Sequence, residues 1–245
     1  MVSNDLKLYR YVSFDHFIQM LFSQEIALVS PSKWDDSYEY YWKYYLKSPA
    51  GKAQLEAYIS QFEGDALKRA ETLISLCNFK YDRAFCLCFT RAKDEEVFWN
   101  TRSDNKRCIM FATTKSKIYN LFSQDDYEVI DEVKYDLERI QPEDFLSSFH
   151  VYSDGILQDN PDELLLHKRT IFSYEKEVRL IFTSVEKSED EIRKIPIPIL
   201  SDFIDGIMVH PLANNDYVSL IELLCKQFNI PFLGKSQIYS FNKNF

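Results

Sequence analysis

The sequence predicts one α+β domain over residues 1–245, with mixed or antiparallel sheets. Helical patterns cluster between groups of strand-like runs instead of alternating regularly with them, which favours α+β over a doubly wound sheet. The chain is also long enough to bury a substantial core. Its 5 glycines against 46% hydrophobic residues indicate packed elements rather than linkers.

The N-terminal part is predicted to open with a strand, a helix and a second strand. Residues 7–12 (KLYRYV) have a strand pattern, and residues 14–23 carry apolar side chains at helical spacing. The run EIALV reads as a strand that Pro31 stops. Residues 38–79 are predicted to be largely helical, so we expect a helical insertion at about this position.

The rest of the chain consists of apolar runs with polar connections. We interpret residues 184–194 as a solvated turn because they are highly charged. Strands are predicted at AFCLCFT, CIMFAT, YEVIDEVKY, EVRLIF, DGIMVHP and IYSF, and helices over most of residues 141–171 and at NDYVSLIELLCKQFN.

Composition argues against several classes of function. A net charge of −9 works against general affinity for nucleic acid or anionic membranes, although Lys106, Arg107, Lys168 and Arg169 could form a local basic patch. No stretch is long and apolar enough to span a bilayer, and the first residues do not resemble a signal peptide, so we expect a soluble, cytoplasmic protein. The five cysteines lack zinc-site spacing and are interpreted as buried free thiols.

The first candidate site lies in the opening strand. Arg10 would face the same side as Leu8, and Tyr9 and Tyr11 the other side. An arginine in the middle of a strand is costly to bury unless an anion or carboxylate pairs with it. The alternative is an exposed or salt-bridged arginine on a surface strand.

A compact acidic group follows the second predicted strand. Asp36 or Ser37 could cap a helix there, and Glu39 would add a favourable charge to its first turn. Asp35 is not explained in this way. A divalent metal site at Asp35, Asp36 and Glu39 is therefore a weaker alternative, and no metal is predicted.

The loop FWNTRSDN contains another candidate. Trp99 together with Arg102 or Arg107 could stack on a ring and hold a phosphate, since arginine forms bidentate pairs. Equally, Trp99 could fill the core beneath the loop.

The stretch SYEKEVRLIF is the most informative. As a strand it would place Glu175, Glu177 and Arg179 on one face. Two carboxylates on one face suit a site that stabilises positive charge or orients a hydroxyl. The alternative is a salt-bridge ladder in which Arg179 pairs with a neighbouring carboxylate.

These stretches resemble a bacterial domain-of-unknown-function family, number 2971, almost from end to end. LYRYVSFDHFIQMLFSQEIALVSPSKWDDSYE is similar to its opening, although Asp35 and Ser37 stand where the family has Asn and Pro. AFCLCFT and FWNTRSDN resemble its cysteine strand and tryptophan loop, with Thr101 and Arg102 in place of a histidine-tyrosine pair. SYEKEVRLIF and DGIMVHP resemble its glutamate-rich and penultimate strands.

A more distant resemblance to the ADP-ribosyltransferase superfamily implies a mechanism and an ADP-ribosyltransferase-like core. The strand-helix-strand opening and the late E-x-E-V-x-L strand carry this resemblance. It implies that Arg10 contacts NAD, Glu177 is the catalytic glutamate and Glu175 helps to activate the acceptor. The superfamily's serine-threonine-serine strand is absent from the sequence, so Tyr9, Tyr11, Trp99 or Arg102 would have to contact the nicotinamide and the phosphates.

The resemblances imply an NAD-using ADP-ribosyltransferase-like enzyme, as an intracellular toxin or phage-defence effector with an unidentified acceptor. The first alternative is a catalytically inactive module that senses a nucleotide or a phage component. A weaker alternative is a metal-dependent hydrolase or nuclease using Asp35, Asp36 and Glu39.

Overall fold

One large mixed β-sheet organises the part of the chain that the structure describes. In a computed structural model, this part comprises residues 5–40, 48–61, 63, 64, 68, 72, 75, 82–101, 105–122, 127–136, 165–184 and 190–240. Its strands are β1 (Lys7–Val12), β2 (Glu25–Val29), β3 (Ala84–Thr90), β4 (Ile109–Thr114), β5 (Tyr127–Glu132), β6 (Glu177–Thr183), β7 (Ile192–Pro196), β8 (Gly206–Val209) and β9 (Phe232–Lys235).

The described strands form a single sheet in the order β5-β6-β3-β1-β4-β8-β9, and β2 leaves this path to pair with β3 and β7. The pairings are antiparallel except that of β8 with β9, which is parallel. This confirms the predicted α+β class with a mixed sheet.

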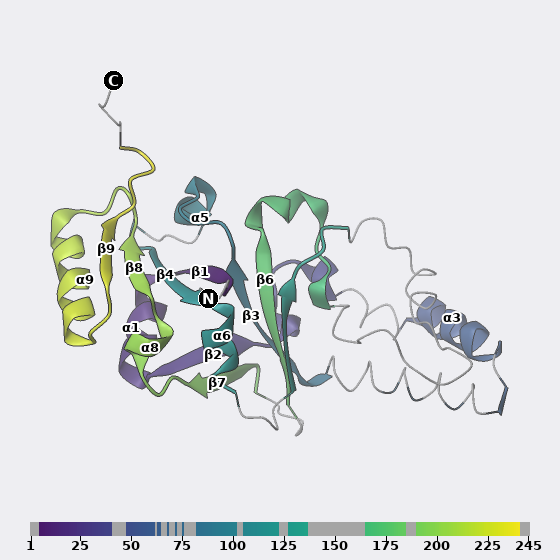
Figure 1. Cartoon of the computed structure of the whole chain (residues 1–245). Coiled ribbons are helices and arrows are strands. Elements are labelled where there is room, and N and C mark those ends of the chain that lie inside the picture. Colours follow the sequence, from purple (N-terminus) through teal and green to yellow (C-terminus); the bar gives the residue numbers. More distant parts are fainter. Residues whose placement is uncertain are drawn as a thin grey trace.

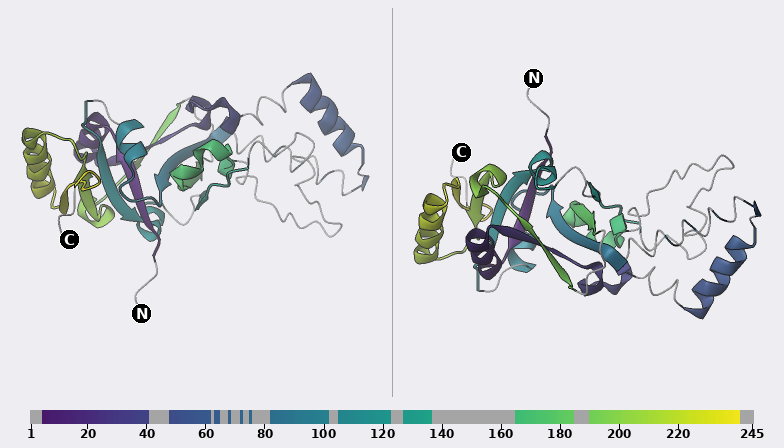
Figure 2. Two further views of the ribbon diagram at one scale, coloured as in Figure 1. Left: turned by 90° about the horizontal axis from the view of Figure 1, so that it is seen from above. Right: turned by 90° about the horizontal axis from the view of Figure 1, so that it is seen from below.

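The described helices are short apart from three. They are α1 (Phe14–Ser23), α3 (Pro49–Ile59), α5 (Glu96–Thr101), α6 (Lys115–Tyr119), α8 (Leu200–Phe203) and α9 (Asn215–Gln227), with 3-10 helices η1 (Pro31–Lys33), η2 (Ser37–Tyr40) and η5 (Thr170–Glu175). Helices α3 and α9 lie at opposite ends of the molecule, with the sheet between them (Figures 1 and 2). Within the described residues, no helix is both long and apolar enough to cross a bilayer.

Side-chain caps explain where the two helices beside the core begin. The Ser13 hydroxyl accepts a hydrogen bond from the backbone N–H of His16 at the start of α1, and the Asn214 side chain accepts one from Tyr217 at the start of α9. Phe17 and Leu21 of α1 and Ile221 of α9 are fully buried in the main hydrophobic core. The amphipathic pattern therefore fixes which face of each helix meets the sheet.

The pairing of β3 leaves part of one edge open, and this opening positions the site. One edge of β3 pairs with β6 along its whole length, from Ala84 opposite Thr183 to Thr90 opposite Glu177. On the other edge, β1 pairs with β3 at Tyr9 and Thr90. β2 meets that edge at the opposite end of β3, and β1 pairs along its length with β4 instead. The middle of this edge of β3 therefore faces a gap between β1 and β2.

The structure corrects three local predictions near the loops. Residues 238–240 of IYSF are not in a strand, and Phe241 lies outside the described residues: β9 forms earlier, at Phe232–Lys235, where it pairs with β8. In the charged stretch 184–194, residues 185–189 lie outside the described residues, and Ile192 begins β7, which pairs with β2. The charged residues there indicate that the strand is exposed to solvent, and they do not exclude a strand. The predicted loop around Trp99 contains α5, because burial of Phe98 and Trp99 favours a helical turn.

Two predicted helical regions are described only in part. Within residues 38–79, α3 is helical, as are the described positions 64, 68, 72 and 75, while residues 41–47, 62, 65–67, 69–71, 73, 74 and 76–79 lie outside the described residues. Within residues 141–171, positions 141–164 also lie outside them. Residues 165–171 are not α-helical, because Lys134 and His167 pair as an isolated bridge and η5 begins at Thr170.

Truncating a core ring should destabilise the fold more than truncating a surface residue. Phe111 of β4 is fully buried and contacts the rings of Phe89 and Phe203 edge-on or tilted. We expect Phe111→Ala to lower the free energy of unfolding by about 3–5 kcal/mol, because the cavity left behind loses dispersion contacts. Leu223→Ala, at a side chain that is 65% exposed, should change it by less than about 0.5 kcal/mol in urea denaturation. Equal losses would contradict the assignment of the core.

Candidate active site

A cavity of about 520 Å³ opens where β1 and β2 separate over β3. Its walls come from β1, β2, β3 and β6, from the segment that spans η1 and η2, and from Lys168 to Glu175. The volume lies in the range of small-molecule sites. Ten charged side chains line it, five cations and five carboxylates: Arg10, Lys33, Lys168, Arg169 and Arg179 with Asp35, Asp36, Glu39, Glu175 and Glu177.

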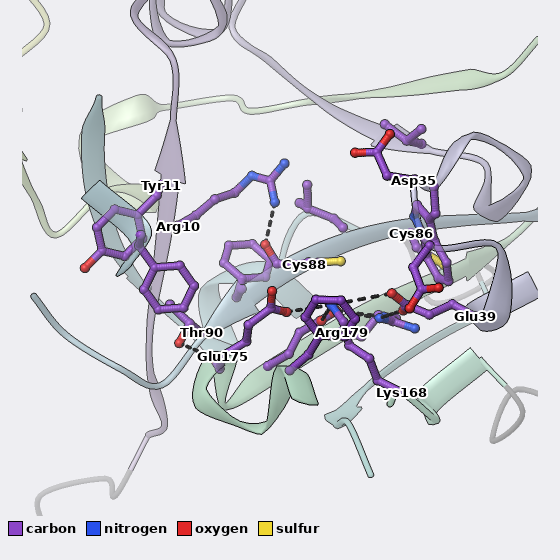
Figure 3. Close-up of a pocket in the computed structure, with 18 of the residues that line it drawn as sticks. Arg10, Tyr11, Asp35, Glu39, Cys86, Cys88, Thr90, Lys168, Glu175 and Arg179 are labelled. Atoms are coloured by element: carbon purple, nitrogen blue, oxygen red, sulfur yellow. Dashed lines mark hydrogen bonds and ion pairs between the residues drawn. The ribbon is translucent and has the colours of Figure 1, made fainter. Parts of the chain in front are cut away.

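Arg10 occupies the gap beside β3. Its guanidinium donates to the backbone carbonyl oxygen of Cys88, which lies on the partly open edge of that strand. A buried carbonyl without a strand partner needs another donor, and the arginine supplies it. Arg10 and Tyr11 point in opposite directions from β1, as alternation along a strand requires (Figure 3).

Tyr11 is held by the loop after β3. Its hydroxyl accepts hydrogen bonds from the backbone N–H groups of Asp94 (2.9 Å) and Glu95 (3.3 Å), and its ring stacks on Phe98 with centroids 4.9 Å apart. Burial raises the pKa of Tyr11 well above its usual value, so it stays neutral. This side of the cavity is therefore a fixed aromatic wall.

A buried charge network forms the opposite wall, across β3 from Arg10 (Figure 3). Arg179 donates through Nε to Glu177 (2.8 Å) and through a terminal nitrogen to Glu39. Lys168 Nζ contacts Glu177 at 2.9 Å, Glu175 at 2.5 Å and Glu39 at 3.5 Å. We call these five residues the charge network. It holds one more carboxylate than cation.

Every member with a resolved pKa shift is held in its charged form. Burial alone would raise the pKa of Glu177, but the adjacent Arg179 and Lys168 outweigh it and hold the pKa far below its usual range. Burial would likewise lower the pKa of Lys168, yet the three carboxylates raise it. Burial is the main cause that raises the pKa of the Cys88 thiol to about 12, and the nearby charge of Glu177 adds to it. The Cys88 thiol is therefore protonated and unreactive.

Aromatic rings cover the arginines of this wall. The guanidinium carbon of Arg179 lies 4.2 Å from the ring centroid of Trp34, and Arg179 is 1% exposed. Arg169 lies between the rings of Tyr38 and Phe172, at 4.6 Å and 5.2 Å, and its Nε donates to Asp36 (2.9 Å). Cation–π contacts of this kind fix the plane of each guanidinium.

The structure brings most of the sequence-predicted site residues together. Arg10, Tyr9, Tyr11, Glu175 and Glu177 all line the cavity. Glu175 is not in a strand, however: it ends η5, and Lys176 then takes a left-handed conformation before β6 begins at Glu177. Arg179 is salt-bridged, but its partners are Glu177, two residues before it in the same strand, and Glu39 of η2, and not a carboxylate in a ladder across neighbouring strands.

Of the residues predicted to contact the cofactor, Trp99 does not line the cavity, and Arg102 cannot be placed. Trp99 is fully buried in the core with Met110 and Cys108, and its indole N–H donates to Asp94 (2.8 Å), so it fills the core beneath the loop. This corrects its prediction as a binding residue. Arg102 lies outside the described residues.

The structure also bears on two other predictions, the basic patch and the metal site. Lys168 is buried among carboxylates, so it cannot contribute to a basic surface. Asp36 pairs with Arg169 and Glu39 with Arg179, while Asp35 is exposed. Among the described residues, no three His, Cys, Asp or Glu side chains are grouped as metal ligands. Two of the three carboxylates of the predicted metal site, Asp36 and Glu39, are thus engaged by arginines.

Sequence reasoning missed Lys168 as the centre of the site. The LLLHKRTIF stretch carries an apolar helical pattern, which hides a buried lysine. Three glutamates in two motifs, Glu39 in one and Glu175 and Glu177 in the other, were a signal that a buried cation had to compensate them. Nothing in the local sequence pairs Glu39 with residues some 130 positions later.

Comparisons with known proteins give a distant structural likeness. The structure of Thermus sp. 2.9 DarT in complex with NAD+ matches with a TM-score of 0.41 and 8% identity, covering 98% of this chain and 100% of that chain. Its complex with ADP-ribosylated ssDNA matches with a TM-score of 0.37 and 9% identity, covering 93% of each chain. The carba-NAD+ complex gives 0.39 and 10%, covering 97% of this chain and 99% of that chain.

No family model and no curated protein matches the chain, so its resemblance to family 2971 stays a prediction. At the TM-scores and identities above, the DarT likeness carries no argument about activity. The function must therefore be argued from the cavity itself.

Removing the central lysine should be costly. Lys168→Met leaves three carboxylates facing one another in a buried site, and we expect a loss of about 3–5 kcal/mol in unfolding free energy. The matched control is Lys117→Met, which breaks an ion pair with Asp205 between side chains that are 30% and 37% exposed. It should cost at most about 1 kcal/mol. Similar losses in the two variants would show that the charge network is not buried as described.

Stability should also fall in acid. Because the pKa of Glu177 is lowered on folding, its ionised form stabilises the fold above its ordinary pKa of 4.5, and this contribution is lost as the pH falls below that value. Urea denaturation from about pH 7 to about pH 3 should show this decline. The Glu177→Gln variant should have a shallower decline, whereas an unchanged slope would contradict the shift.

Proposed function

We propose that the chain is an NAD-using, ADP-ribosyltransferase-like enzyme and that the cavity is its active site. The observation that carries the proposal is that Arg10 and Glu177 line one cavity from β1 and β6, the two strands on either side of β3. Residues 167 positions apart thus supply a cation and a carboxylate to one ligand-sized space.

The carboxylate wall suits the chemistry. When nicotinamide leaves NAD, positive charge develops on the ribose, and a fixed carboxylate stabilises that charge. Donors from Arg179 and Lys168 hold Glu177 ionised in one orientation, so little reorganisation is needed during the reaction. The extra carboxylate of the charge network leaves that wall with net negative charge.

The other proposed roles follow from position. Arg10 contacts the bound nucleotide from the opposite wall, and the Tyr9 and Tyr11 side of β1 supplies ring contacts. The Glu175 side chain, 15% exposed against 3% for Glu177, is the better placed carboxylate to activate an acceptor. The toxin or phage-defence role comes from the family resemblance and remains part of this proposal, and the acceptor is unidentified.

A second candidate is a nucleotide-sensing module without catalysis. The observation in its favour is that both oxygens of Glu177 already accept hydrogen bonds from cations. A carboxylate so engaged contributes less to a developing charge than one that is free. This candidate expects the same ligand in the same cavity but no nicotinamide release.

Turnover of NAD separates the two candidates. The intact chain is incubated with NAD labelled in the ADP-ribose part and cell lysate, and nicotinamide release and label transfer are measured. We expect release to fall by about 100-fold or more in Glu177→Gln, because the charge-stabilising carboxylate is lost. Glu175→Gln should reduce label transfer more than release.

The matched control is Glu132→Gln, which removes an exposed carboxylate paired with Arg91 on the neighbouring strand β5. It should keep full activity, and thermal melting should show that each variant is folded. Binding of NAD without release by the intact chain would favour the sensing module. Undiminished release by Glu177→Gln would rule out the proposed role of this residue.

A further inference from the structure

Arg169 differs from the other cations along the charge-network wall of the cavity. Lys168 and Arg179 are buried and bound to carboxylates of the charge network. Lys33 is half exposed and pairs with Glu191 at 2.6 Å. The Arg169 side chain is 28% exposed and lines the cavity, and its one ion pair within the described residues is to Asp36.

The contacts of Arg169 fix its orientation without using its terminal nitrogens. The rings of Tyr38 and Phe172 hold the plane of the guanidinium, and the bond from Nε to Asp36 holds one edge of it. The two terminal nitrogens have no hydrogen-bond partner among the described residues. Three neighbouring side chains, those of Tyr38, Phe172 and Asp36, thus orient the guanidinium and leave its terminal donor edge without a partner among the described residues.

This geometry matches a phosphate. A guanidinium presents parallel N–H donors that bind two oxygens of a phosphate or carboxylate at once, and prior stacking reduces the entropy lost on binding. A carboxylate ligand fits less well here, because Asp36 already balances one charge and a phosphate carries more negative charge and more oxygens. The favoured ligand group is therefore a phosphate.

We infer that Arg169 is the anchor for a phosphate group of the ligand and that the cavity selects phosphorylated nucleotides over nucleosides. The inference rests on the proposed function for the identity of the ligand, and it assigns to Arg169 the phosphate contact that the sequence suggested for Arg102. Asp36 and Tyr38 then act as positioning residues for Arg169.

The test is isothermal titration of ADP-ribose, nicotinamide riboside and inorganic pyrophosphate into the intact chain and its variants. Arg169→Gln should weaken ADP-ribose and pyrophosphate binding by about 10- to 100-fold, because charge-assisted bonds are lost. It should leave the binding of nicotinamide riboside, which has no phosphate, unchanged. Arg169→Lys keeps the positive charge but not the parallel N–H donors of the guanidinium, so it should give an intermediate loss of affinity.

Two further variants distinguish the loss of the phosphate contact from misfolding of the chain. Tyr38→Leu removes one ring of the stack on an exposed side chain and should weaken ADP-ribose binding severalfold while Arg169 itself remains. Arg91→Gln removes an arginine of an exposed ion pair with Glu132 that does not line the cavity, and this variant should bind every ligand as the intact chain does.

The outcomes separate this inference from the proposed function. If ADP-ribose binds equally to the intact chain and Arg169→Gln, or if nicotinamide riboside loses affinity to the same extent, Arg169 is not the phosphate anchor, whatever the chain does with NAD. If pyrophosphate binds in an Arg169-dependent way but ADP-ribose and NAD do not bind, the anchor stands and the proposed function fails. If no ligand binds the intact chain, both fail.

Discussion

The structure around the cavity depends on two buried cations meeting three carboxylates. Arg179 and Lys168 would each be costly to bury alone, and so would Glu39, Glu175 and Glu177. Together they join β6 to the η2 segment and to the segment before β6, because each cation contacts carboxylates from different parts of the chain. Such a network contributes little net stability compared with apolar packing, but it permits only one arrangement of these segments.

The cavity itself arises from how the sheet is paired. β3 is fully paired with β6, but β1 and β2 each meet only one end of its other edge. The open middle is occupied by the side chain of Arg10, which satisfies the carbonyl of Cys88. Burial and, after it, the nearby charge of Glu177 raise the pKa of the Cys88 thiol, so this residue of β3 lies close to both the cationic and the carboxylate sides of the cavity. The same irregularity thus creates the space and positions its charges.

The charges in this space fall into two kinds. Those of Lys168 and Glu177 are held in their charged forms by the network, which favours a preorganised electrostatic role for these two residues over direct exchange of protons. Arg169, at a more exposed position, is fixed by rings and by Asp36 but keeps donors for a ligand. The charge network, whose side chains are fixed in place, and Arg169, which keeps donors for a ligand, suit a ligand that has a sugar at one end and phosphates at the other.

The sequence by itself determined the α+β class, most strands, α1 and α9. It also determined that Arg10 and Glu177 lie in strands. Periodicity and capping report which face of each element is buried, and these are local properties. Only the tertiary structure decided that Trp99 fills the core, that β7 forms within a charged stretch and that Lys168 is buried. It also decided that Glu39 pairs with Arg179, 140 positions away. An ion pair depends on which segments approach one another in space, and the pattern of a single segment carries no information on that approach.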